Sequence, residues 1–345
     1  METNRTPSNQ APVDVQIVGA GVAGLVAANL AIDAGLTVRL IERRSAPGGR
    51  AATTDHHGYA LNVGPHALYL QGAFRQILDQ LDLVPAGTAP EVVGGTGSIG
   101  DRVGLLPVGP ASLVRTGLLS ARAKVEVGRF LARLPRLDPH RFADTTVEEW
   151  IGRSVRSADA RALLGGIINL STYNAAADRA SADAAAAQLQ IALDPGVHYV
   201  HGGWGTIVEG LSARAAARGV ERVEASIVGV SPRQATDGPA VTVAETTYGA
   251  RLQARTCLIA AGGPTVVDRL LDLGTKTAEA AGPSVEASAL DLGLRRRPAV
   301  GAHLGLDRRL YATVQSVAPG QTPPGRHLVG LARYRLPGES TRCSP

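Results

Sequence analysis

Three glycines and one glutamate near the start of the chain have the residue types and spacing of a dinucleotide site. Gly19, Gly21 and Gly24 form a G-x-G-x-x-G turn, and Glu42 follows about 20 positions later. The first glycine permits a tight turn, the second lets the backbone approach a pyrophosphate, and the third lets a helix pack closely on a strand. The carboxylate of Glu42 can accept hydrogen bonds from both hydroxyls of an adenosine ribose.

The elements that must position these residues are visible around them. Residues 15–18 form an apolar run that is typical of a buried strand, and residues 25–34 predict an apolar helix that Gly35 ends. Residues 38–41 predict a second strand. The start of the helix directs unpaired N–H groups and the positive end of its dipole towards the phosphates. This order of elements favours a dinucleotide-binding unit over a structural Gly-rich turn.

A second Gly-rich turn, Gly48-Gly49-Arg50-Ala51, follows the second strand, and Gly64-Pro65-His66 comes soon after it. The guanidinium of Arg50 adds donors and a permanent positive charge that suit a diphosphate. The whole run, from the first turn to residue 69, resembles the flavin-dependent amine oxidase and phytoene desaturase superfamily. In that family the arginine of the GGR motif contacts the diphosphate of FAD.

The resemblance implies both a fold and a cofactor. The implied fold is α/β, with a Rossmann-like FAD-binding domain interleaved with an α+β substrate domain of helices and a mixed sheet. The implied cofactor is FAD. The residues of the first segment that the resemblance assigns to cofactor binding are Gly19, Gly21, Val22, Ala23, Gly24, Glu42, Arg43, Gly48, Gly49, Arg50 and Ala51.

A later block returns to the pattern of a nucleotide domain. A helix is expected over 206–218, strands over 220–223, 226–230, 241–244 and 252–255, and a further apolar strand from Cys257 that ends in glycines. By the same resemblance, Val228 would lie by the adenine, and Ala261 and Gly262 by the diphosphate. A generic βαβ packing element is the alternative for this block.

The segments expected from this pattern alternate along the chain. They are a disordered lead (1–12), a first FAD-binding segment (13–70), a largely helical substrate segment (71–198), a second FAD-binding segment (199–273), a substrate-domain sheet (274–336) and a polar, unstructured tail (337–345). Members of the superfamily usually continue into a last FAD-binding segment, and nothing like it follows here. The sequence therefore predicts a flavin site that is incomplete in this chain and retains flavin weakly.

The composition of the chain argues against several classes of binding partner. The net charge of +5 is scattered, without the dense Lys/Arg run typical of nucleic-acid binding. Two cysteines cannot make a disulfide framework or a zinc site. Without a signal-peptide pattern or an apolar run of membrane-spanning length, we expect a cytoplasmic protein. The basic amphipathic stretch 112–134 is interpreted as a solvated face, with peripheral membrane contact as the alternative.

No hydrolase motif stands out, so the hard chemistry would be the cofactor's. The resemblance implies hydride transfer from a substrate C–H to flavin N5. Amine-oxidising relatives carry a late lysine near the flavin, whereas this chain has no lysine after Lys276. Together with the absence of acidic or aromatic clusters suited to an ammonium ion, this favours an apolar substrate of carotenoid or isoprenoid type. His66 is the candidate for a residue near the isoalloxazine, and a structural histidine is the alternative.

Other functions remain open on the sequence alone. A nicotinamide-dependent dehydrogenase would share the first turn, but would not need the second Gly-rich turn or the late block. An amine oxidase-type enzyme is a second alternative, and a catalytically impaired or truncated FAD-binding protein is a third. The electron acceptor and the oligomeric state are not indicated.

Overall fold

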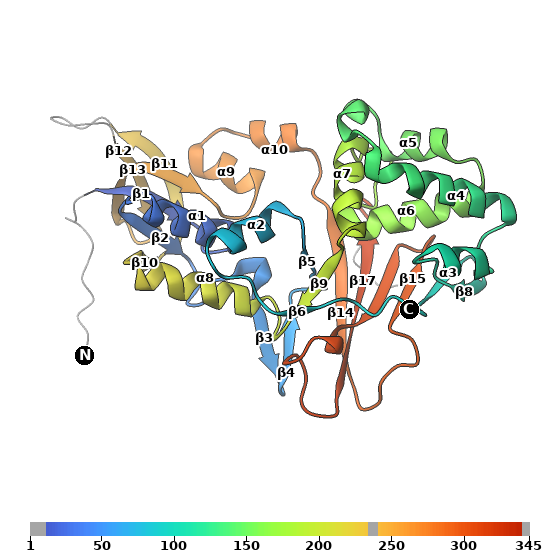
Figure 1. Ribbon diagram of the computed structural model, residues 1–345. Helices are drawn as coiled ribbons and strands as arrows, with labels where there is room; N and C mark the ends of the chain where they lie inside the picture. The colour runs from blue at the N-terminus through green and yellow to red at the C-terminus, as the bar shows by residue number, and fades with distance from the viewer. Residues whose placement is uncertain (1–11, 234–240, 340–345) are drawn as a thin grey trace. The chain divides into compact units, whose positions relative to one another are not determined.

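The computed structural model describes residues 12–233 and 241–339, and the chain divides into two compact units (Figure 1). Unit 1 comprises Met1–Ala52, Ile77–Val84 and Trp204–Pro283. Unit 2 comprises Thr53–Gln76, Pro85–Gly203 and Ser284–Pro345. The two units alternate along the chain, and the predicted fold class of a Rossmann-like domain interleaved with an α+β domain is confirmed.

Unit 1 is built on a six-stranded sheet in the order β10-β2-β1-β13-β12-β11, in which β10, β2, β1 and β13 run parallel. Its elements are β1 (Val13–Val18), α1 (Val22–Asp33), β2 (Val38–Glu42), the 3-10 turn η1 (Gly49–Ala51), α8 (Gly205–Ala217), β10 (Glu221–Glu224), β11 (Ile227–Arg233), β12 (Val241–Thr246), β13 (Arg251–Ile259), α9 (Pro264–Leu271) and α10 (Lys276–Ala281).

The parallel strands of unit 1 are covered by apolar packing and by helices. Val18 and Ile41 share a buried cluster with Val230 and Leu252, so the antiparallel strands pack against the tips of β1 and β2. Helices α1 and α8 lie side by side (Figure 1), joined by the fully buried Asn29, whose amide donates to backbone oxygens of both helices. This bond satisfies a polar group that would otherwise be costly to bury.

Unit 2 contains a mixed six-stranded sheet in the order β14-β17-β16-β15-β7-β8, the small sheet β5-β9-β6 and the hairpin β3-β4. Its strands are β3 (Thr53–His56), β4 (Tyr59–Asn62), β5 (Leu68–Tyr69), β6 (Gly87–Thr88), β7 (Thr96–Ile99), β8 (Arg102–Leu105), β9 (Val197–Val200), β14 (Glu286–Leu294), β15 (Ala302–Gly305), β16 (Leu310–Val314) and β17 (His327–Arg335). Its helices are α3 (Pro110–Arg115), α4 (Ala121–Arg133), η2 (Leu134–Arg136), η3 (Pro139–Phe142), α5 (Val147–Ser154), α6 (Ala158–Thr172), α7 (Ala182–Leu193) and η4 (Gln315–Val317). Helix α2 (Ala73–Gln80) crosses the boundary between the units.

The core of unit 2 lies between its helices and one face of the large sheet. Phe130, Trp150 and Leu163 from the helices belong to the same buried cluster as Tyr311 and Ala332 from the sheet. The alternation of side chains along a strand explains this arrangement, since residues two apart point to the same face. No helix in residues 12–233 or 241–339 is long and apolar enough to cross a membrane.

The unit boundaries differ from the expected segments. Residues 53–70, expected in the first FAD-binding segment, belong to unit 2, because β3 and β4 pair with each other and β5 pairs with β9. The N–H of Ala60 also donates to Gln321 O at 3.0 Å, which joins the hairpin to the late part of unit 2.

Two local expectations also need correction. The strands expected at 252–255 and from Cys257 form one strand, β13. The expected unstructured tail is ordered as far as Glu339, whose carboxylate pairs with Arg309 and Arg333. Residues 1–11 of the expected lead and residues 340–345 of the tail lie outside the described residues.

Candidate functional site

The three glycines of the first turn have three different structural roles. Gly19 has φ +108°, and a Cβ on it would lie 2.9 Å from Ala260 O. A Cβ on Gly24 would lie 1.8 Å from Gly19 O, which is far inside contact distance, so α1 can approach the turn only with glycine there. Gly21, the N-cap of α1, has no atom within 4 Å of a Cβ position. Its surface is therefore open to a ligand.

The first turn of α1 offers donors to that surface. Intrahelical bonding begins with Leu25 N–H donating to Gly21 O, so the N–H groups of Val22, Ala23 and Gly24 have no partner within the helix. No acidic side chain occupies this turn, and the N-cap makes no side-chain bond. The helix start therefore suits an anionic group.

Glu42 is held at the first turn by two backbone donors. Its Oε2 accepts from Ala20 N–H at 2.8 Å, and its Oε1 accepts from Arg44 N–H at 3.1 Å. These bonds fix the orientation of the carboxylate, while each oxygen retains a second lone pair. The half-buried Glu42 can therefore accept two further hydrogen bonds from vicinal hydroxyls.

The second Gly-rich turn lies directly against the first. Gly48 N–H donates to Ala20 O at 2.8 Å, and a Cβ on Gly49 would lie 3.7 Å from the Cα of Gly21. Gly48 and Gly49 both have positive φ, which only glycine adopts without strain. The turn closes through Ala51 N–H, which donates to Gly48 O at 2.9 Å. The structure thus brings the two predicted turns together.

Two arginines next to these turns carry free charge. Arg43 and Arg50 are exposed, and neither guanidinium has a hydrogen bond or ion pair within the part of the chain that the structure describes. An unpaired guanidinium beside the open backbone of Gly21 is a suitable counter-charge for a diphosphate.

Arg222, which sequence reasoning missed, fixes the loop between the turns. Its guanidinium donates to Arg44 O at 3.3 Å and also to Ser45 O. It reaches this loop because β10 pairs in parallel with β2, with Arg222 opposite Leu40. No local motif predicts this pairing, so only the sheet order reveals the contact.

The late block also reaches the first turn. Ala260 N–H donates to Val18 O at 2.9 Å, and a Cβ on Gly19 would lie 3.0 Å from the Cα of Ala261. Gly262 has φ +73°, and a Cβ there would meet Val266 at 2.3 Å, so glycine lets the chain turn into α9. Ala261 therefore lies against the first turn, while the contact of Ala261 and Gly262 with a diphosphate stays a prediction.

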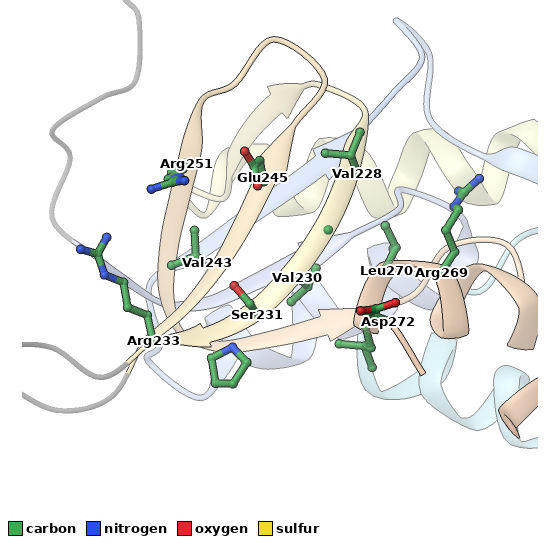
Figure 2. Close-up of a pocket in the computed structure, with 13 residues that line it drawn as sticks. Val228, Val230, Ser231, Arg233, Val243, Glu245, Arg251, Arg269, Leu270 and Asp272 are labelled. Carbon is green, nitrogen blue, oxygen red and sulfur yellow. The ribbon is translucent and has the colours of Figure 1, made fainter. Parts of the chain in front are cut away.

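Val228, which the resemblance places by the adenine, lies on β11 rather than in the two Gly-rich turns, and its contact with the cofactor stays a prediction. It is 49% exposed and lines a separate hollow of about 610 Å³ formed by β11, β12 and the end of α9. Figure 2 shows Arg233 and Arg269 on opposite sides of this hollow, so their charges do not converge. None of the residues from Gly19 to Ala51 lines it. The segment that leads into β11 is joined to β2 by a hydrogen bond from Ala225 N–H to Glu42 O, at 2.9 Å.

His66 belongs to unit 2, whereas the cluster just described belongs to unit 1. Its Nδ1 lies 2.8 Å from Gly64 O. A carbonyl oxygen only accepts, so Nδ1 carries the proton in this contact. The turn is held in place by Tyr173, whose hydroxyl donates to Pro65 O at 2.9 Å.

Unit 2 contains a cluster of tyrosine side chains, most of which lie in its core. Although aromatic residues are scarce, five tyrosines interact within this unit, namely Tyr69, Tyr173, Tyr199, Tyr311 and Tyr334. Tyr199 and Tyr311 bring their hydroxyls within 2.6 Å, and the rings of Tyr173 and Tyr334 meet edge to face at 5.7 Å. Burial raises the pKa of all five hydroxyls, so they remain protonated donors.

Comparison with known proteins agrees with the geometry of unit 1. The family model of an NAD(P)-binding Rossmann-like domain matches residues 17–81. A phytoene dehydrogenase from Streptomyces griseus is 31% identical over 169 residues, which are 45% of this chain and 32% of that protein. The aligned region is thus a minor part of the length of this curated relative.

Solved structures extend the comparison over both units. An oxidoreductase from Methanosarcina mazei has a TM-score of 0.74 at 18% identity, covering 94% of this chain and 79% of that one. A putrescine oxidase bound to putrescine has a TM-score of 0.71 at 19% identity, covering 94% and 76%. At these identities the structures establish a shared fold. Together with the sequence matches, they make this chain similar to the FAD-dependent amine oxidase and phytoene desaturase-like superfamily.

Proposed function

We propose that the protein is an FAD-dependent oxidoreductase of the phytoene dehydrogenase-like type. The observation that carries the proposal is the contact of the second Gly-rich turn with the first, through Gly48 N–H and Ala20 O at 2.8 Å. A nicotinamide enzyme needs the first turn alone, whereas two opposed turns with a free guanidinium suit the diphosphate of FAD.

Each part of unit 1 takes one part of the cofactor in this proposal. The open backbone at Gly21 and the start of α1 bind the diphosphate, together with Arg50. Glu42 binds the ribose through the free lone pairs of its fixed carboxylate. Ala261 forms the wall beneath Gly19. Bound FAD would supply two-electron oxidation of a substrate C–H, and the protein would bind, orient and exclude water.

An apolar substrate is supported by the similarity to a phytoene dehydrogenase. On α3 and α4 the exposed side chains of Val114 (73%) and Val125 (51%) lie in sequence beside the exposed Arg115 and the half-buried Lys124, whose ammonium donates to Val114 O. An exposed surface that mixes apolar and basic side chains supports a peripheral membrane contact, through which such a substrate would be delivered.

Oxidation of an amine is the second candidate, because Tyr69 and Tyr173 of the tyrosine cluster are only half-buried and aromatic faces attract cations. The other three rings, those of Tyr199, Tyr311 and Tyr334, are buried in the core of unit 2 and offer no face to a ligand. The missing late lysine remains the argument against a standard amine oxidase. The fold shared with a putrescine oxidase is compatible with either candidate.

The test is a calorimetric titration of the purified chain with FAD, ADP and NAD, alongside its absorption spectrum. Arg50→Ala should weaken FAD binding about 10- to 100-fold, because charge-assisted bonds to phosphate are lost. Arg251→Ala is the matched control, since Arg251 is also exposed but starts β13, at the opposite end from Gly19. NAD binding more tightly than FAD, or an Arg50→Ala variant that binds FAD as well as the parent, would refute the proposal.

A further inference from the structure

The edge strand β14 of unit 2 carries one carboxylate on an otherwise small-residue face. In the register with β17, Asp291 lies opposite Gly330 and Ala289 lies opposite Ala332. Side chains two apart share a face, so Ala289 and Asp291 project to the same side. Ala289 is exposed and Asp291 is half-buried, so this face of β14 is accessible to a ligand.

Asp291 differs from the other perturbed carboxyl groups. No hydrogen bond or ion pair of its side chain is found across residues 12–233 and 241–339. Burial alone shifts its pKa, and the shift is upward. Partners hold the pKa below the ordinary value in each of the others, which are Asp14, Asp33, Glu126, Asp159, Asp183, Asp268 and Glu339. Asp291 therefore has an acceptor capacity that the fold does not use.

A second unsatisfied polar group lies next to it. Gln315 is 4% exposed, and neither its amide nitrogen nor its amide oxygen makes a hydrogen bond of ordinary geometry, although its side chain lies close enough to Tyr199 to lower the pKa of that hydroxyl, which burial raises. Its Nε2 and the Oδ1 of Asp291 both lie 3.4 Å from the position of a Cβ on Gly330. Glycine at 330 therefore leaves space where a carboxylate and an amide converge. Buried polar groups are normally paired, so this convergence requires an explanation.

The same face of β14 also meets the turn that carries His66. A Cβ on Gly64 would lie 3.4 Å from the Cβ of Ala289, which is two residues from Asp291. Tyr173 holds this turn through Pro65 O, and its ring packs against Tyr334. The strand that carries the free carboxylate of Asp291 therefore contacts the turn that carries His66, which Tyr173 holds in place.

We propose that Asp291, supported by Gln315, forms a subsite that binds a hydrogen-bond-donating group of the substrate. The inference rests on the proposed oxidoreductase function and narrows its substrate to a molecule that is not a pure hydrocarbon. A donor group supplies the bond that Asp291 lacks, whereas an apolar or anionic group would leave the carboxylate unpaired or repel it. A hydroxyl and an ammonium share this chemistry.

Three probe molecules of equal chain length distinguish a hydroxyl from an ammonium as the donor group. They are hexan-1-ol, hexylammonium and 1-methoxypentane, an isomer of hexan-1-ol that accepts but cannot donate. Binding to the full chain at neutral pH is measured from the backbone amide NMR shifts of Leu290, Asp291 and Gly330. In the parent, a donor probe should bind about ten-fold more tightly than the ether, as expected for one hydrogen bond to a charged group.

Substitutions then assign the preference to the carboxylate. Asp291→Leu should abolish the ten-fold preference. Asp291→Asn keeps a carbonyl acceptor, so it should retain a preference for the alcohol but lose one for the ammonium. Ser288→Ala is the matched control, because Ser288 is exposed on the same strand but points to the opposite face.

Two results would overturn the subsite. One is equal binding of the ether and both donors by the parent, and the other is a donor preference that survives in Asp291→Leu. FAD titration of the same variants keeps the two proposals apart, since Asp291→Leu should bind FAD like the parent. A parent that binds no FAD but selects donor probes through Asp291 would refute the proposed function and leave the subsite standing.

Discussion

Gly21 and Gly24, three residues apart, should respond in opposite ways to the same added methyl group. In Gly24→Ala the new Cβ would lie 1.8 Å from Gly19 O, so α1 must move away from the turn by roughly 1 Å or more. Overpacking of this kind costs about 1–3 kcal/mol, while the better helix propensity of alanine returns about 1 kcal/mol. At this degree of overlap we expect a net loss of about 2 kcal/mol.

Gly21→Ala should leave the free protein unchanged. Gly21 has φ −73° and ψ 178°, which alanine adopts freely, and its Cβ would meet nothing within 4 Å. The small cost of alanine at an N-cap is offset by the lower entropy of the unfolded chain, so the net change should stay within about 0.5 kcal/mol. The methyl group would nevertheless occupy the surface that the diphosphate needs, and FAD affinity should fall at least ten-fold, or about 1.4 kcal/mol.

Urea unfolding of the ligand-free variants, followed by FAD titration, measures both effects. For Gly24→Ala we expect a lower unfolding midpoint before any ligand is added. For Gly21→Ala we expect the midpoint of the parent together with weak FAD binding. A Gly21→Ala variant that binds FAD like the parent would show that the diphosphate does not approach there. A Gly24→Ala variant as stable as the parent would show that the turn and the helix are not in close contact.

Two further changes test the supports of the site and of unit 2. Arg222→Met should weaken ADP binding several-fold while leaving adenosine binding unchanged, because Arg222 holds the loop through Arg44 and Ser45 that leads into the second Gly-rich turn. Calorimetry with the two ligands measures this difference. Equal losses of affinity for ADP and adenosine would contradict the role of Arg222. Glu126 accepts from the backbone N–H groups of Arg156 and Ser157, and the bond from the Ser157 N–H is the main cause that lowers the pKa of Glu126 to about 2. A lowered pKa in the folded state gives stability that is present above the ordinary value of 4.5 and is lost as the pH falls towards about 2, so Glu126→Gln should make the urea midpoint less dependent on pH over that window than in the parent.

The sequence by itself determined the nucleotide-binding half of the site. Gly19, Gly24 and Glu42 lie within one strand–helix–strand unit, where each residue's role follows from local backbone geometry and from the period of the apolar residues. The capping box that begins α5 was predictable for the same reason: Thr146 and Glu149 bond to each other's N–H groups within a single turn. Interactions between neighbours in sequence leave a pattern that can be read without the fold.

Tertiary structure alone decided which distant segments meet. Arg222 reaches Ser45 only because β10 pairs with β2, and no composition or spacing records that register. Tyr199 and Tyr311 are more than a hundred positions apart, so their hydrogen bond exists only once the sheets have packed. Asp291 looks like an ordinary surface acid in the sequence, and its unpaired state depends on what the rest of unit 2 places around it. Local chemistry thus specified the two Gly-rich turns of unit 1, while burial and strand pairing across long separations specified the arrangement of unit 2.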